Sequence, residues 1–264
     1  MFLRDTLLNR LRRGCQTLAY PHGPAPVLPD RHGGALKLEA AKCPPDCTAC
    51  VAICPTEAIT RQPHKPTALD LGRCIFCAEC VRICPAGAIT QTGNHRMAVR
   101  RREDLVLGAQ GQEQVRLAGA LDDRLRSLFG RSLRLRQVSA GGCNACEADT
   151  NVLSTIGWDL GRFGIQFVAS PRHADGLLIT GPVSKNMELA LEKTYAAVPD
   201  PKLVIAVGAC AIAGGPFQGN PPIRNGAGDC VPVDLYIPGC PPHPLTILDG
   251  LLRLLSPEGI PADL

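Results

Sequence analysis

Cysteine is the residue type whose spacing in this chain suggests chemistry. The segments CTACVAICPTEAIT (47–60) and CAECVRICPAGAIT (77–90) are two copies of one pattern, in which C-x2-C-x3-C is followed directly by proline. One more cysteine precedes each copy. Thiolates are preferred ligands of iron-sulfur clusters and of zinc. The repeat therefore predicts two metal centres held by eight cysteines: Cys43, Cys47, Cys50, Cys54, Cys74, Cys77, Cys80 and Cys84.

The shape of a cubic four-iron cluster suggests how these cysteines divide. Such a cluster needs four thiolates from different directions, and a short loop that enters a helix supplies only three. The pattern resembles that of bacterial ferredoxins with two 4Fe-4S clusters, in which the last cysteine of each run binds the other cluster. This resemblance implies a first cysteine set of Cys43, Cys47, Cys50 and Cys84, and a second cysteine set of Cys54, Cys74, Cys77 and Cys80.

The first loop departs from the ferredoxin pattern by one residue. Cys43 and Cys47 enclose three residues (CPPDC), whereas Cys74 and Cys77 enclose two. This difference weakens the case for Cys43 as a ligand, although no other cysteine lies near enough to replace it.

Other uses of cysteine and other partners fit the sequence less well. A zinc-binding structural adaptor remains an alternative, but zinc knuckles need neither the x3-Cys-Pro extension nor a duplication. Disulfide frameworks suit shorter secreted chains, and no signal peptide opens this one, so a reducing cytosol is the expected compartment. The net charge of +4 and the lack of basic stretches interleaved with aromatics predict no nucleic-acid partner.

The N-terminal region, residues 1–35, is expected to hold an amphipathic helix and an extended arm. Leu3, Leu7 and Leu11 recur every four residues among arginines, and Gly14 ends the pattern. Such a helix lies either on a membrane or membrane-bound partner, or on the protein's own surface. Prolines and glycines between 21 and 34 indicate the irregular arm. No apolar run reaches eighteen residues, so no membrane span is expected.

The rest of the chain divides into three regions. Residues 36–98 are predicted to form an α+β ferredoxin domain, and the Arg-rich segment 99–132 a linker with one helix, because leucines recur there at helical spacing: Leu117, Leu121, Leu125 and Leu128. Residues 133–264 alternate short apolar runs with helical stretches, including 188–197 and 244–255, which predicts a flavodoxin-like parallel α/β domain. Its strands are expected at 133–139, 163–170, 175–181, 201–208 and 234–239.

A third cysteine set follows the strands of this second domain. Cys143 and Cys146 come after the first strand, Cys210 after LVIAVG, and Cys240 after LYIPG. Ligands bind outside the carboxyl ends of the strands in open parallel sheets, so these four thiols are expected to meet at one edge and hold a third cluster. Alternatively, Cys210 and Cys240 are ordinary small buried residues.

Four segments of the second domain resemble, in order, the small subunit of membrane-bound NiFe hydrogenases of the formate hydrogenlyase type and the related cluster-bearing small subunit of respiratory complex I. They are GGCNACEAD, FGIQFVASPRHADGLLITGPV, PKLVIAVGACAIAGG and VPVDLYIPGCPPHP. The N-terminal third resembles the two-cluster ferredoxin subunit of the same complexes, so the chain looks like a fusion of two subunits. The resemblance implies that the third cysteine set holds the cluster proximal to the catalytic subunit. Complex I relatives carry two adjacent cysteines where Asn144 and Ala145 separate Cys143 from Cys146 here, which favours the hydrogenase branch.

These features imply an electron-transfer subunit with three 4Fe-4S clusters on the cytoplasmic face of a membrane complex. Because every C-x2-C pair is assigned to a cluster, none remains for a nickel-iron centre, and a separate catalytic large subunit is expected. Membrane-arm subunits and a second electron carrier or ferredoxin-type subunit are the other implied partners. The alternative is a complex I-like quinone oxidoreductase module with the same clusters.

Two carboxylates and two cysteines remain to be placed. Glu147 and Asp149 are candidates for a proton relay beside the third cysteine set, or else ordinary carboxylates at a helix N-terminus. Cys15 and Cys230 are expected to be plain thiols.

Overall fold

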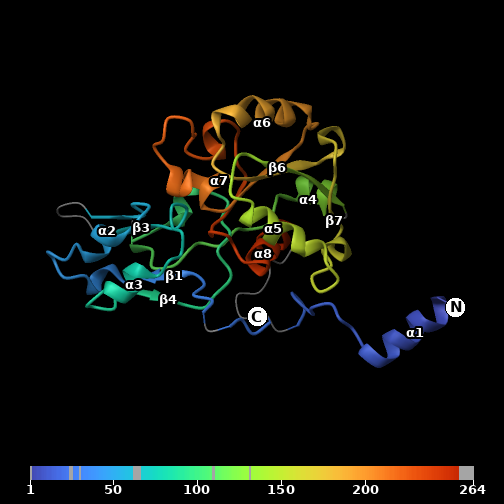
Figure 1. The fold of residues 1–264 in the computed structure, drawn as a ribbon, viewed down its shortest axis with the longest axis horizontal. Coiled ribbons are helices and arrows are strands. Elements are labelled where there is room, and N and C mark those ends of the chain that lie inside the picture. Colours follow the sequence, from blue (N-terminus) through green and yellow to red (C-terminus); the bar gives the residue numbers. More distant parts are fainter. Residues whose placement is uncertain are drawn as a thin grey trace.

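The computed structural model describes residues 2–23, 26–29, 31–61, 67–108, 111–130 and 132–255. It shows a small N-terminal unit that packs against a larger parallel α/β domain, with an N-terminal helix extending away from both (Figure 1). The predicted fold class is thus confirmed for each part.

The N-terminal unit contains two small antiparallel sheets and two short helices. One sheet pairs β1 with β4, and the other has the order β2-β3-β5. The strands are β1 (Leu36–Leu38), β2 (Ile59–Thr60), β3 (Ala68–Asp70), β4 (Ile89–Gln91) and β5 (Val106–Leu107). Helices α2 (Ala49–Ile53) and α3 (Glu79–Ile83) each carry one buried cysteine on the inner side, Cys50 or Cys80.

The segment predicted as a linker takes part in both units. Strand β5 completes the sheet of the N-terminal unit through its pairing with β3, although it lies beyond residue 98. Val99 forms an isolated antiparallel bridge with Tyr236 of the larger domain. The chain between the units is therefore hydrogen-bonded to each of them.

The larger domain is a five-stranded parallel sheet in the order β10-β9-β8-β6-β7. This is the flavodoxin-like order 2-1-3-4-5, in which the direction of strand addition reverses between β6 and β8. The strands are β6 (Leu133–Ser139), β7 (Ile165–Phe167), β8 (Gly176–Thr180), β9 (Leu203–Val207) and β10 (Leu235–Ile237). Strands β8 and β9 are buried along their whole length, as expected for a parallel sheet covered on both faces.

Helices cover the two faces of this sheet. One face packs on leucines of α8 (Pro244–Leu255) in the largest apolar cluster, and α5 (Ala145–Asn151) and α4 (Asp123–Phe129) contact the same helix. Leu191 of α6 (Lys185–Ala197) packs with Leu177, Ile179 and Val204 on the opposite face. Ala206 and α7 (Ala209–Ala213) join the core of the N-terminal unit, so the two units share one apolar core.

The leucine spacing in the linker misplaced one helix. Helix α4 begins at Asp123, because the Asp122 carboxylate accepts a hydrogen bond from the Leu125 amide at 2.9 Å and caps the first turn. Leu117 and Leu121 lie before it. Leu121 is 2% exposed and its amide donates to the Leu254 carbonyl, so its burial reflects packing on α8.

The N-terminal helix forms as predicted. Helix α1 spans Phe2–Arg13, and Gly14 ends it with φ +65° and an amide bond to the Arg10 carbonyl. Leu7 and Leu11 are 56% and 81% exposed, so this side of α1 is not docked on the described part of the chain. None of the helices in the described ranges is long and apolar enough to cross a membrane.

Candidate metal centres

The first cysteine set surrounds one cavity in the N-terminal unit. Its four thiols, together with Arg61 and the two flanking prolines Pro44 and Pro85, line a cavity of about 320 Å³. Cys84 reaches this cavity from the second copy of the repeat, whereas its three partners come from the first. Cys43 lines it in spite of the wider loop. The structure brings these four thiols together, and their role as ligands stays a prediction.

Arg61 holds the widened loop in place. Its guanidinium donates to the Cys47 carbonyl at 3.1 Å and to the Pro45 carbonyl at 2.8 Å. Sequence reasoning missed this residue, although the repeat contains a signal. The first copy continues into Arg61 where the second continues into Gln91, so the arginine accompanies the loop with the extra residue.

The second cysteine set lines a separate cavity of about 320 Å³. Here Cys54 crosses from the first copy to join Cys74, Cys77 and Cys80. Between these cysteines, Phe76 and Ala78 have φ of +57° and +63°, a conformation that costs non-glycine residues energy and is often found at functional sites. The chain accepts this strain while it wraps the three thiols around the cavity.

Backbone amides point at the sulfurs of both sets. The Ala58 amide donates to Cys54 Sγ at 3.3 Å, and the Ala88 amide donates to Cys84 Sγ at 3.2 Å. Each donor lies four residues after its cysteine, so the two copies of the repeat build the same contact. Amide donors to sulfur stabilise thiolates and tune the potential of a cluster.

The thiols of these sets also suit a polynuclear cluster rather than one ion. Burial raises the pKa of Cys74 to about 12 and that of Cys80 to about 11, so these thiols stay protonated unless a bound cation compensates the charge. Among the described residues, no group of three or more His, Cys, Asp and Glu side chains is placed to hold a single metal ion. The thiols instead surround a space, and the donor set fits a 4Fe-4S cluster.

The third cysteine set gathers at the carboxyl edge of the parallel sheet. Cys143 and Cys146 lie on the loop and first turn after β6, Cys210 on α7 after β9, and Cys240 after β10. Burial, and then the charges of Cys240 and Cys143, raise the pKa of Cys210 to about 12. Burial, and then Cys210 and Cys240, likewise raise the pKa of Cys146. These mutual interactions show that the four thiols lie close together.

Gly208 gives the third set the space that it occupies. It lies between β9 and Cys210 with φ +91°, and a Cβ atom added there would come within 2.5 Å of Cys146 Sγ. Asn144 adopts φ +69° between Cys143 and Cys146, as Ala78 does between Cys77 and Cys80. The same turn thus introduces the helix in two of the three C-x2-C pairs.

Glu147 and Asp149 face different surroundings although both lie on α5. Glu147 is 5% exposed, and its carboxylate accepts hydrogen bonds from Thr180 Oγ1 at 2.7 Å and from Ser139 Oγ. It therefore ties α5 to the ends of β8 and β6. Asp149 is half-buried, and burial raises its pKa. The proton-relay role of both residues stays a prediction.

A further cavity of about 750 Å³ lies between the two units. Ile75 and Phe76 of the second-set loop line it from one side and Cys240 from the other, with Asp149 and His243 in the wall. The His243 ring contacts that of His32 at 5.2 Å between centroids. Cys15 and Cys230 are not among the residues that line this cavity or the two cysteine-lined cavities.

Comparison with known proteins places both units. Residues 143–254 match the family described as NADH ubiquinone oxidoreductase, 20 Kd subunit, and residues 42–88 match the 4Fe-4S dicluster domain. A probable membrane-bound hydrogenase subunit of Pyrococcus furiosus is 41% identical over 133 residues, which make up 50% of this chain and 80% of the relative.

Two other relatives represent the two branches. Subunit 7 of the formate hydrogenlyase of Escherichia coli is 43% identical over 158 residues, which cover 57% of this chain and 62% of the relative. A subunit of the NADH-quinone oxidoreductase of Phocaeicola vulgatus is 41% identical over 140 residues, which cover 52% of this chain and 69% of the relative.

The chain therefore belongs to the family of cluster-bearing small subunits found in membrane-bound hydrogenases and in NADH-quinone oxidoreductase. It is an oxidoreductase subunit with an additional dicluster ferredoxin domain, as predicted. The dicluster match supports bound iron-sulfur clusters and does not favour the zinc adaptor.

Proposed function

We propose that the three cysteine sets hold three 4Fe-4S clusters and that the chain relays single electrons between a catalytic large subunit and an external carrier. A 4Fe-4S cluster, when bound, takes up or gives up one electron. The observation that carries this proposal is the gathering of twelve cysteines into three groups of four, each assembled from separate segments of the chain.

Contacts between the units support an order for the three sets. A Cβ atom added at Gly72 would lie 2.8 Å from Ile212 Cγ2, so the chain just before Cys74 lies directly against α7, which carries Cys210. Arg73 Nε donates to Gln218 Oε1 at 2.7 Å across the same boundary. The second set therefore lies between the first and the third, and the chain offers a route in that order.

Exposure of the third set supports a docking position for the large subunit. Cys143 and Cys240 are exposed, whereas Cys210 is buried. A cluster held partly in water is poorly insulated, so we expect the large subunit to cover this edge. All paired cysteines are assigned to the three sets, and the separation of Cys143 from Cys146 favours a hydrogenase-type partner with its own nickel-iron centre.

The N-terminal helix supports a peripheral attachment to membrane-arm subunits on the cytoplasmic face. Its leucines Leu7 and Leu11 are exposed, and it carries Arg10, Arg12 and Arg13 in the last turn. An apolar stripe with a basic flank binds anionic membrane surfaces or the edge of a membrane-bound subunit.

Purification of the complex without oxygen tests the proposal. We expect about twelve irons and as many sulfides per copy of this chain, and three paramagnetic centres after reduction by dithionite. The double variant Cys15→Ser with Cys230→Ser is the matched control and should keep all of them. A colourless protein with bound zinc would refute the proposal. Hydrogen formation from a reduced one-electron carrier would identify the hydrogenase-type partner, and quinone reduction without it the complex I-like one.

A further inference from the structure

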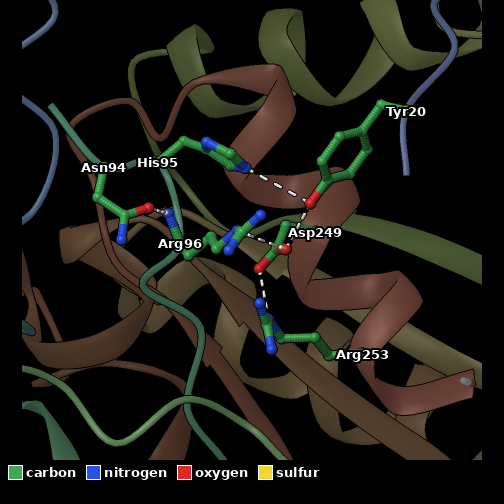
Figure 2. A network of polar contacts seen from close by, with 6 residues as sticks. All are labelled: Tyr20, Asn94, His95, Arg96, Asp249 and Arg253. Atoms are coloured by element: carbon green, nitrogen blue, oxygen red, sulfur yellow. Dashed lines mark hydrogen bonds and ion pairs between the residues drawn. The ribbon is translucent and has the colours of Figure 1, made fainter. Parts of the chain in front are cut away.

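A buried polar network joins three segments that are far apart in the sequence (Figure 2). Tyr20 comes from the N-terminal arm, His95 and Arg96 from the segment after β4, and Asp249 and Arg253 from α8. Their exposures range from 0% for Asp249 to 6% for His95. The network thus lies inside the protein, where the arm, the N-terminal unit and the larger domain meet.

The carboxylate of Asp249 is the centre of the network. Tyr20 Oη donates to its Oδ1 at 2.6 Å, and Arg253 Nε donates to its Oδ2 at 2.7 Å. Arg96 Nε lies 3.9 Å from Oδ1 and forms an ion pair with it. His95 Nε2 lies 3.4 Å from Tyr20 Oη. Buried charge is tolerated only when paired and hydrogen-bonded, so these segments are held in one arrangement.

Both chain segments that leave the network lead to cysteine sets. Helix α8 begins at Pro244, shortly after Cys240 of the third set. In the other direction, the segment of His95 and Arg96 follows β4, which is preceded by Cys84. It continues to Val99, whose amide and carbonyl pair with Tyr236 at 3.0 and 2.9 Å on the edge strand before Cys240.

We propose that Asp249 is a positioning residue that fixes the N-terminal unit against the sheet domain and thereby sets the separation between the second and third cysteine sets. Tyr20 is its partner from the arm and closes the arrangement from outside. This inference rests on the proposed function, because the separation matters only if both sets hold clusters.

The test compares Asp249→Asn with the wild type in the complete complex. The amide keeps the size of the carboxylate but loses the charge that pairs with Arg96 and Arg253. The readout is the magnetic interaction between the reduced clusters of the second and third sets, which falls with the inverse cube of their separation. Asp234→Asn is the control, because the Asp234 carboxylate accepts from the Val204 amide at 2.9 Å within the sheet domain.

We expect Asp249→Asn to retain its iron and lose the splitting caused by this interaction, and Asp234→Asn to retain both. If Asp249→Asn fails to assemble, Tyr20→Phe gives the decision, since it keeps every charge and removes one hydroxyl group; Tyr195→Phe on α6 is its control. A reduced splitting in Tyr20→Phe supports the inference. Full iron with unchanged splitting in Asp249→Asn, or in Tyr20→Phe where Asp249→Asn does not assemble, overturns it. A wild-type complex without clusters would instead overturn the proposed function.

Discussion

Replacement of Gly208 by alanine should remove the third cluster alone. An L-residue with positive φ costs about 1–2 kcal/mol, and the φ of Gly208 is +91°. The added methyl group would also lie 2.5 Å from Cys146 Sγ. Nonbonded heavy atoms approach to about 3.5 Å, so the sulfur must move by about 1 Å. Metal-ligand distances tolerate only about 0.2 Å, so Cys146 would no longer reach the cluster.

Iron analysis and paramagnetic resonance of the purified complex measure this effect. We expect Gly208→Ala to contain about eight irons instead of about twelve, with the signals of the first two sets unchanged. Gly219→Ala is the matched control, because Gly219 has φ +79° and no atom within 4 Å of an added Cβ. Both variants share the backbone cost, and only one displaces a sulfur. Full iron and an unchanged third signal in Gly208→Ala would refute Cys146 as a ligand.

Three further predictions concern the N-terminal unit and its contacts. Cys54→Ala combined with Cys77→Ala should lose about four irons, as either change does alone, whereas Cys54→Ala with Cys47→Ala should lose about eight; an equal loss in both pairs would contradict the crossed arrangement. Burial lowers the pKa of His95 to about 4 from 6.5, so the unfolded chain binds a proton that the folded chain excludes. Stability is therefore complete above about pH 6.5 and falls toward pH 4, with about 2 kcal/mol lost between pH 7 and 5. Denaturant midpoints of wild type and His95→Gln at both pH values measure this, and equal acid sensitivity would exclude His95 as the cause. Removal of iron by a chelator should unfold residues 36–98, because this unit is too small for apolar burial alone to stabilise it; limited proteolysis should then digest it first, and an undigested apo unit would contradict the expectation.

Features written locally in the sequence were predictable. The repeat around Cys54 and Cys84 predicted the crossed grouping of thiols, because ligand spacing is a local property of the chain. Helix α8 begins at Pro244 as expected, since proline is favoured in the first turn and the leucines after it follow the helical period. The parallel direction of the strands in the larger domain followed from their alternation with helices.

Contacts between distant segments were not predictable in the same way. The bond between Tyr20 and Asp249 spans 229 positions, and neither residue belongs to a motif. Strand β5 is only two residues long and was hidden in an arginine-rich stretch. The leucine period before α4 was misleading because Leu121 is buried by packing on α8, so apolar spacing there reflected tertiary contact instead of a helix.

The bond between Tyr20 and Asp249 also orders events during synthesis. The arm leaves the ribosome 229 residues before its partner, so it cannot close until nearly the whole chain has been translated. By then Cys84 has long emerged and both copies of the repeat are complete. Iron delivery to the N-terminal unit therefore has an interval in which the loops are still open, and closure of the arm is among the last steps of maturation.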